Sequence, residues 1–112
     1  MGNLNHYAGI LSQVLRQEAS QQPRLVPIRL AAVCDEEAGE FLLIGTGWEK
    51  SGQRVDTIYF HARLCDHTVI IETDHTEAGL AGSLREAGIA AEDLTSGAAF
   101  NHGEPSPEPV AA

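Results

Sequence analysis

The residues best suited to bind a metal lie around one of the two cysteines. Cys65, Asp66 and His67 are adjacent in the sequence, and His61 lies six residues earlier. Structural zinc sites combine one closely spaced ligand pair with a second, distant pair, and the chain has no such spacing. A turn at Cys65 and Asp66 would also separate His61 from His67. We therefore expect a hairpin here, with no metal site and no cofactor.

A second stretch places an acid, an imidazole and a hydroxyl together, at Asp74, His75 and Thr76. Catalytic triads are assembled in space rather than along the sequence, and no second group of reactive side chains stands near this one. The start of a helix explains the acids without chemistry, because Asp74 and Glu77 have the spacing of a capping box. We predict no catalytic residue, and a protein that is not an enzyme.

The glycines Gly45 and Gly47 flank Thr46 in a pattern that could suggest a phosphate loop. No helix is predicted to follow them, so the helix N-terminus that binds phosphate is missing. We expect these glycines to let Trp48 or a neighbouring backbone approach closely. We expect Cys34 and Cys65 to be small buried hydrophobic residues rather than reactive thiols.

Composition narrows the class of protein further. The chain has 112 residues and a formal net charge of −9, which disfavours direct nucleic-acid binding. It contains no apolar run of membrane-spanning length and no secretory signal pattern at its N-terminus. Two cysteines do not make a secreted disulfide framework. The sequence thus predicts a cytoplasmic protein with one domain over residues 1–97, and a Pro-rich, flexible tail over 98–112.

Hydrophobic periodicity predicts the elements that position these residues. Residues 4–19 have the three- and four-residue spacing of an amphipathic helix. Four strands are expected at 25–34, 41–48, 53–64 and 67–73, with short turns between them. A second helix begins at Asp74 and ends at Gly88, which suits a C-terminal cap. The expected fold is α+β, a four-stranded antiparallel meander with an N-terminal and a C-terminal helix packed on one face.

Alternation along the predicted strands divides the apolar residues between the two faces of the sheet. One face is expected to carry Ile58, Phe60, Ala62, Leu64, Phe41 and Leu43. The opposite face is expected to be apolar as well, and two short helices cannot cover both. An uncovered apolar face is typical of a protein interface, unless the register differs and all these residues share one core. The predicted interface consists of Leu30, Leu42, Ile44, Tyr59, His61 and Ile70.

Several segments in this order resemble the XisI family, whose members are named controlling factors for excision of the fdxN element in cyanobacteria. The N-terminal helix with Leu4 and Tyr7 is similar to that family's Leu-x-x-Tyr helix, and residues 41–49 to its hydrophobic strand ending in Gly-Trp. Residues 74–81 resemble its Asp-x-Thr-Glu-x-Gly-Ile-Ala segment. The resemblance covers residues 4–94, and the C-terminal segment departs from the family pattern. The matching motif positions are Trp48, Asp74, Thr76, Glu77, Gly79 and Gly88.

The resemblance implies a non-enzymatic accessory protein, and it assigns those motif positions structural or interface roles. The usual genetic neighbour of the family, XisH, resembles a nuclease fold. We therefore expect the chain to bind an XisH-like protein by covering its basic DNA-binding surface, and to control excision of a DNA element. Two alternatives remain open: a homo-oligomeric scaffold, and an antitoxin-like inhibitor of a nuclease without any role in excision. A DNA-binding recombination factor is disfavoured by the charge.

Overall fold

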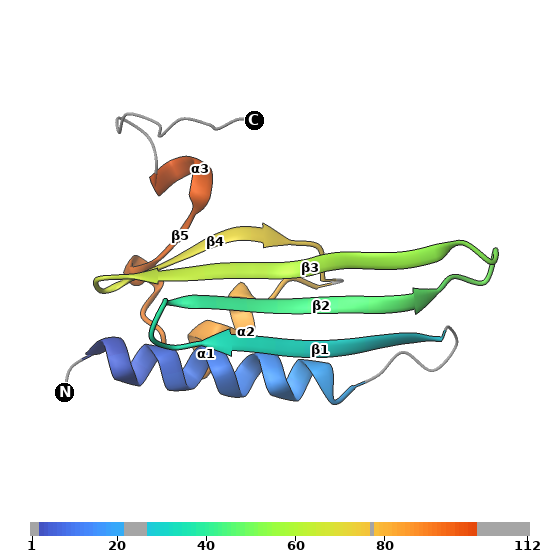
Figure 1. The fold of residues 1–112 in the computed structure, drawn as a ribbon. Helices are drawn as coiled ribbons and strands as arrows, with labels where there is room; N and C mark the ends of the chain where they lie inside the picture. Colours follow the sequence, from blue (N-terminus) through green and yellow to red (C-terminus); the bar gives the residue numbers. More distant parts are fainter. Residues whose placement is uncertain (1–2, 22–26, 77, 101–112) are drawn as a thin grey trace.

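The computed structural model describes residues 3–21, 27–76 and 78–100. Three helices, one 3₁₀ turn and five strands follow one another in these ranges (Figure 1). They are α1 (Asn3–Ala19), β1 (Ile28–Asp35), β2 (Glu40–Trp48), β3 (Arg54–Cys65), β4 (Thr68–Asp74), α2 (Ala81–Glu86), η1 (Ala91–Asp93), β5 (Leu94–Ser96) and α3 (Gly97–Phe100).

One sheet contains all five strands in the order β1-β2-β3-β4-β5. The first four strands form the expected antiparallel meander, and β5 pairs in parallel with β4. The α+β class is therefore confirmed, whereas the expectation of four purely antiparallel strands is wrong. The fifth strand has only three residues, so its sequence carries no alternation that could predict it.

The helices α1 and α2 pack on the same side of the sheet, and α1 runs alongside β1 (Figure 1). We call this side the helix-covered face. Its core combines apolar residues from both helices with alternate residues of the strands. The buried members are Tyr7, Ala8, Ile10, Leu11, Leu15, Phe41, Leu43, Phe60, Ala62, Val69, Leu80, Leu84 and Ile89. The predicted pairing of Phe41, Leu43, Phe60 and Ala62 on one face is confirmed.

The predicted start of the second helix at Asp74 is wrong. Asp74 is the last residue of β4, and α2 begins only at Ala81. The carboxylate of Asp74 accepts hydrogen bonds from the backbone N–H of Thr76 at 3.1 Å and of Leu80 at 2.8 Å. Asp74 thus orders the connection between β4 and α2 and does not form the expected capping box at the start of a helix. Glu77, the other expected capping residue, lies outside the described residues.

The predicted end of this helix is confirmed. Gly88 has a φ of +126°, which favours glycine, and its N–H bonds to the carbonyl of Arg85 at 3.1 Å. The N–H of Ile89 bonds to the carbonyl of Leu84 at 3.0 Å, and the Ile89 side chain is buried. These two bonds are those of a Schellman cap.

Two irregularities in the pairing change which residues share a face. Leu43 pairs with Phe60 but Ile44 pairs with Ile58, so Tyr59 is an extra residue in β3. His61 pairs with Thr73 but Ala62 pairs with Ile71, so Glu72 is an extra residue in β4. Each β-bulge reverses the alternation that a sequence pattern assumes. The prediction that Ile58 shares a face with Phe60 is therefore wrong.

The domain boundary predicted near residue 97 falls at the start of α3, which spans Gly97–Phe100 and contacts β4 and β5. The remainder of the predicted tail, residues 101–112, lies outside the described residues. None of the helices within the described ranges is long and apolar enough to cross a membrane.

Candidate functional site

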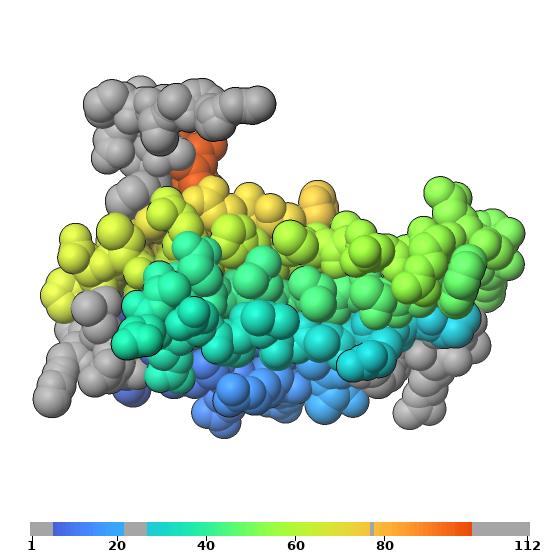
Figure 2. Space-filling view, viewed as in Figure 1, coloured from blue at the N-terminus to red at the C-terminus, as the bar shows by residue number. Residues whose placement is uncertain are grey.

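The side of β1, β2 and β3 that faces away from α1 and α2 is the main candidate for a binding surface. We call it the open face, and Figure 2 shows these strands in front with α1 visible below them. No described helix lies over them in this view. By alternation, the open face contains Arg29, Ala31, Val33, Asp35, Glu40, Leu42, Ile44, Thr46, Trp48, Arg54, Asp56, Ile58, His61 and Arg63.

The open face exposes large apolar side chains. Among the residues that the structure describes, three large apolar side chains are exposed, namely Val33 at 45%, Trp48 at 49% and Ile58 at 43%. All three lie on the open face, and the half-buried Leu42 and Ile44 lie beside them in the pairing register. Exposed apolar side chains that gather on one face are typical of an interaction surface.

Charged groups at both ends of the open face already have partners. The Nε2 of His61 lies 2.7 Å from Oε1 of Glu40, and the Nε of Arg63 lies 2.9 Å from Oε2 of Glu72. At the other end the guanidinium of Arg54 stacks over the Trp48 ring, 5.1 Å from its centroid. Charges that are paired within the chain lose less solvation energy when a partner covers them.

Three of the six residues predicted for the interface lie on the open face, namely Leu42, Ile44 and His61. The placement of Leu30 was wrong: it pairs with Gly45 and shares the helix-covered face with Ala32 and Cys34. The sequence of β1 has apolar residues on both sides, so only its pairing with β2 and its core contacts identify the buried side.

The placement of Tyr59 was also wrong. Its ring packs against the core, and a Cβ on Gly45 would overlap that ring. The bulge at Tyr59 turns this residue towards the helices, which the regular alternation of β3 would not allow. A close approach is thus present at Gly45, but the neighbour is the Tyr59 ring rather than the expected Trp48 or backbone.

Ile70 lies on the side of the open face but is completely buried. It pairs with Arg63 and lies between Val69 and Ile71, which both pack against the helix-covered core. The helix α3 contacts β4 here, and a Cβ on Gly97 would overlap the carboxylate of Glu72. Ile70 therefore belongs to a covered edge and is not available to a partner.

Sequence reasoning missed Val33 and Ile58, the two aliphatic residues that the open face exposes most. Ile58 was assigned to the core because it precedes Phe60 by two residues. No local signal marks the bulge at Tyr59, although Gly45, over which the Tyr59 ring lies in the neighbouring strand β2, leaves room for a bulky ring.

The motif residues Asp74, Thr76 and Gly79 lie at the end of β4 and in the connection to α2 rather than in a helix. The hydroxyl of Thr76 donates to Oδ1 of Asp74, and Gly79 has a φ of +79°. The N–H of His75 donates to the carbonyl of Tyr59 at 2.7 Å. The connection is therefore fixed to the bulge of β3, which gives Asp74, Thr76 and Gly79 a structural place.

The other motif positions lie at the end of β2. Trp48 is its last residue, and its N–H donates to the carbonyl of Pro27 at 3.1 Å. A Cβ on Gly47 would overlap the Pro27 backbone, so this glycine allows the close backbone approach that the sequence predicted. Nη1 of Arg54 donates to the Gly47 carbonyl at 3.3 Å, which helps to hold the arginine over Trp48.

On the helix-covered side, Tyr7 connects α1 to η1. Its hydroxyl donates to Oδ2 of Asp93 at 2.6 Å and accepts from the N–H of Ala90 at 3.3 Å. The hydrogen bond to the Asp93 carboxylate raises the pKa of Tyr7 above its ordinary value of 10.0, and burial adds to the effect. The buried position of Tyr7 makes this a structural contact.

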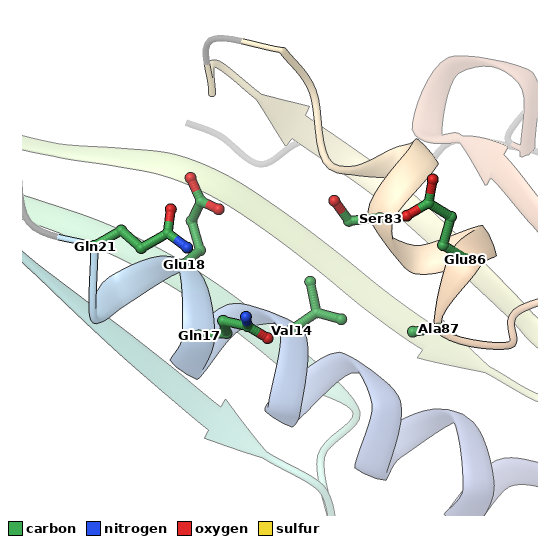
Figure 3. A pocket seen from close by; sticks show the side chains of 7 residues that line it. All are labelled: Val14, Gln17, Glu18, Gln21, Ser83, Glu86 and Ala87. Carbon is green, nitrogen blue, oxygen red and sulfur yellow. The ribbon is translucent and has the colours of Figure 1, made fainter.

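A groove of about 350 Å³ lies between α1 and α2 (Figure 3). Its lining offers carboxylate, amide and hydroxyl groups, and no imidazole or thiol. The lining residues are Val14, Gln17, Glu18, Gln21, Ser83, Glu86 and Ala87. Within the described ranges, no group of three or more His, Cys, Asp or Glu side chains lies close enough to hold a metal ion.

Comparison with known proteins decides the family. The family model described as "XisI protein" matches residues 1–104, which is most of the chain. The chain belongs to the XisI family. No curated protein matches it significantly.

Two solved structures show the same fold as this XisI family chain. A XisI-like protein from Anabaena variabilis is 19% identical with a TM-score of 0.72, and the match covers 83% of this chain and 84% of that protein. The fdxN element excision controlling factor XisI from the same organism is 24% identical with a TM-score of 0.62, over 84% of this chain and 90% of that protein. At these identities the two structures support the fold and leave the function to be proposed.

Proposed function

We propose that this chain is an accessory protein that controls excision of a DNA element by binding a nuclease-like, XisH-like partner, and that it contributes no catalytic residue. Membership in the XisI family supports a regulatory role, since one structural neighbour is named an excision controlling factor. The observation that carries the partner interaction is an acidic turn between β1 and β2.

The acidic turn runs from Asp35 to Glu40 and contains four carboxylates in six residues. Oδ1 of Asp35 accepts the N–H of Ala38 at 3.0 Å, and the hydroxyl of Ser12 donates to Oε2 of Glu36 at 3.3 Å. Glu37 is exposed. The turn thus holds several negative charges in fixed positions at one end of the sheet.

A nuclease binds DNA through a basic surface, because phosphates are neutralised by Lys and Arg. A fixed acidic turn on a chain of net charge −9 has the complementary charge for such a surface. Covering that surface would keep the nuclease from DNA until the element is to be excised. This explains how a protein that does not bind DNA itself can control a DNA rearrangement.

Co-purification of the chain with an XisH-like, nuclease-like protein tests the proposal. We expect one complex at micromolar concentration, weakened by salt and by the variant Glu37→Lys. The matched control is Glu49→Lys, which changes the charge equally but lies in the turn at the opposite end of β2. Separate elution of the two proteins, or equal weakening by both variants, would contradict the proposal.

A further inference from the structure

We propose that the open face is the interface of a two-fold symmetric homodimer, in which a second copy packs the same face against it with its strands reversed. This inference does not rest on the proposed function. It comes from the order of side chains along the three strands of the open face.

The pairing register arranges twelve of these side chains in four rows across β1, β2 and β3, and Trp48 and Arg54 lie beyond the first row. The two middle rows are mainly apolar, and the two outer rows are polar. The first row is Arg29, Thr46 and Asp56; the second is Ala31, Ile44 and Ile58; the third is Val33, Leu42 and His61; the fourth is Asp35, Glu40 and Arg63.

A two-fold axis that runs across the strands between the two middle rows places each strand over the same strand of the second copy. Ala31 then lies over Val33 of the second copy, and Leu42 over its Ile44. In the outer rows, Arg29 lies over Asp35 of the second copy, so unlike charges meet on β1. On β3, Asp56 of one copy likewise lies over Arg63 of the other. The face is therefore complementary to itself, as a two-fold interface requires.

Face-to-face sheets pack about 10 Å apart with strands rotated by about 30°. The apolar residues near the axis stay in register under this rotation, and the long Arg side chains near the ends can follow it. Contact between the two sheets would remove the exposed apolar surface of Val33 and Ile58 from water.

Charge favours the open face over the rest of the molecule as the place where two copies meet. The whole chain carries −9, so two copies repel each other at long range. The open face carries three arginines and, with Glu72 beside Arg63, four carboxylates, so its formal charge of −1 is far smaller than that of the whole chain. The hydrogen bond between His61 and Glu40 and the ion pair between Arg63 and Glu72 also lower the cost of removing these groups from water.

The helix α3 fits this arrangement. It contacts β4. The strand β4 pairs only with the half of β3 that begins at Phe60. The other half of β3, residues 54–58, extends past β4 (Figure 1). Under the two-fold axis, α3 of each copy lies beside this free half of β3 in the other copy, so α3 does not obstruct the contact.

Sedimentation velocity of the full chain over a concentration series tests the proposal. We expect a dimer, and we expect Ile58→Lys to raise its dissociation constant roughly tenfold or more, because a symmetric interface experiences each substitution twice. Gln13→Lys is the matched control on the exposed side of α1 and should leave the dimer unchanged.

A charge swap tests the axis itself. Asp35→Arg lowers the net negative charge, so general repulsion predicts a tighter dimer, whereas the proposal predicts a weaker one because Arg29 then faces an arginine. The double variant Arg29→Asp, Asp35→Arg should restore the dimer. Asp56→Arg, which places like charges together on β3, should weaken it as well.

Three results would overturn the proposal. The first is a monomer at roughly 100 μM, since a specific dimer of this kind should form well below that concentration. The second is a dimer that Ile58→Lys and Asp35→Arg do not affect. The third is a monomer that loses its nuclease-like partner with Ile58→Lys, which would assign the open face to that partner. Loss of the partner complex with Glu37→Lys in an intact dimer would leave both proposals standing.

Discussion

Ile58 and Phe60 lie two residues apart on β3, yet Phe60 is completely buried among the helices and Ile58 is 43% exposed. The bulge at Tyr59 separates them and sends them to opposite faces of the sheet. The helix-covered face gathers the core of the molecule, and the open face gathers its exposed aliphatic side chains. One extra residue in a strand therefore places Ile58 on the open face and leaves Phe60 in the core.

Phe60→Ala should have the largest effect on stability. Its ring is fully buried in the helix-covered core, so its removal should lower the free energy of unfolding by about 3–5 kcal/mol. Urea unfolding followed by circular dichroism measures this value. A loss under about 1 kcal/mol would place Phe60 outside the core.

Gly45→Ala should come next, because the new Cβ would overlap the Tyr59 ring. Overpacking of this kind costs about 1–3 kcal/mol. In a double-mutant cycle the cost should fall when Tyr59 is also replaced by Ala, since the obstacle is then gone. Costs that simply add would show that Tyr59 does not lie over Gly45, and the two faces would have to be redrawn.

Tyr7→Phe should cost about 1–2 kcal/mol, because it removes the hydrogen bond to the Asp93 carboxylate. The pKa of Tyr7 is raised in the folded state, so the wild-type advantage is complete below the unfolded value near 10. The advantage should disappear as pH rises through the folded pKa. Unfolding of both proteins at pH values on either side of about 10 measures this difference. A difference that does not change with pH would contradict the assignment.

Val33→Thr should have the smallest effect on folding. Val33 is 45% exposed on the open face, and a nearly isosteric, strand-compatible residue there should change the free energy of unfolding of the monomer by less than about 0.5 kcal/mol. Ala62→Thr is the contrasting change at a fully buried position on the other face and should cost several times more. Similar losses for both variants would remove the distinction between the faces.

The sequence predicts the parts of this fold whose signals are local. The amphipathic spacing of α1, the turns of the meander and the Gly88–Ile89 cap each depend on a few neighbouring residues, and all agree with the structure. Asp74 is a partial case. Its carboxylate accepts backbone N–H groups, as expected of a capping residue, but these belong to Thr76 and Leu80 in the connection, and α2 starts later than predicted.

The sequence prediction is wrong where the pairing between strands decides which residues share a face. The bulges at Tyr59 and Glu72 are visible only when partner residues are known, and each reverses the alternation from which the faces were assigned. The strand β5 forms because Leu94 reaches the core and pairs beside Val69, not because its three residues favour a strand. Pairing and core contacts place Leu30 and Tyr59 on the helix-covered face and bury Ile70. Leu42, Ile44 and His61 lie on the opposite face, as predicted.

The central claim is that the open face serves association and contributes little to folding. Ile58→Lys tests it most directly, with urea unfolding measured at a dilution where the chain is monomeric. We predict a free energy of unfolding within about 1 kcal/mol of the wild type, together with loss of self-association in sedimentation. A loss of several kcal/mol, as expected for a charge in the core beside Phe60, would contradict the division of the sheet into a covered and an open face.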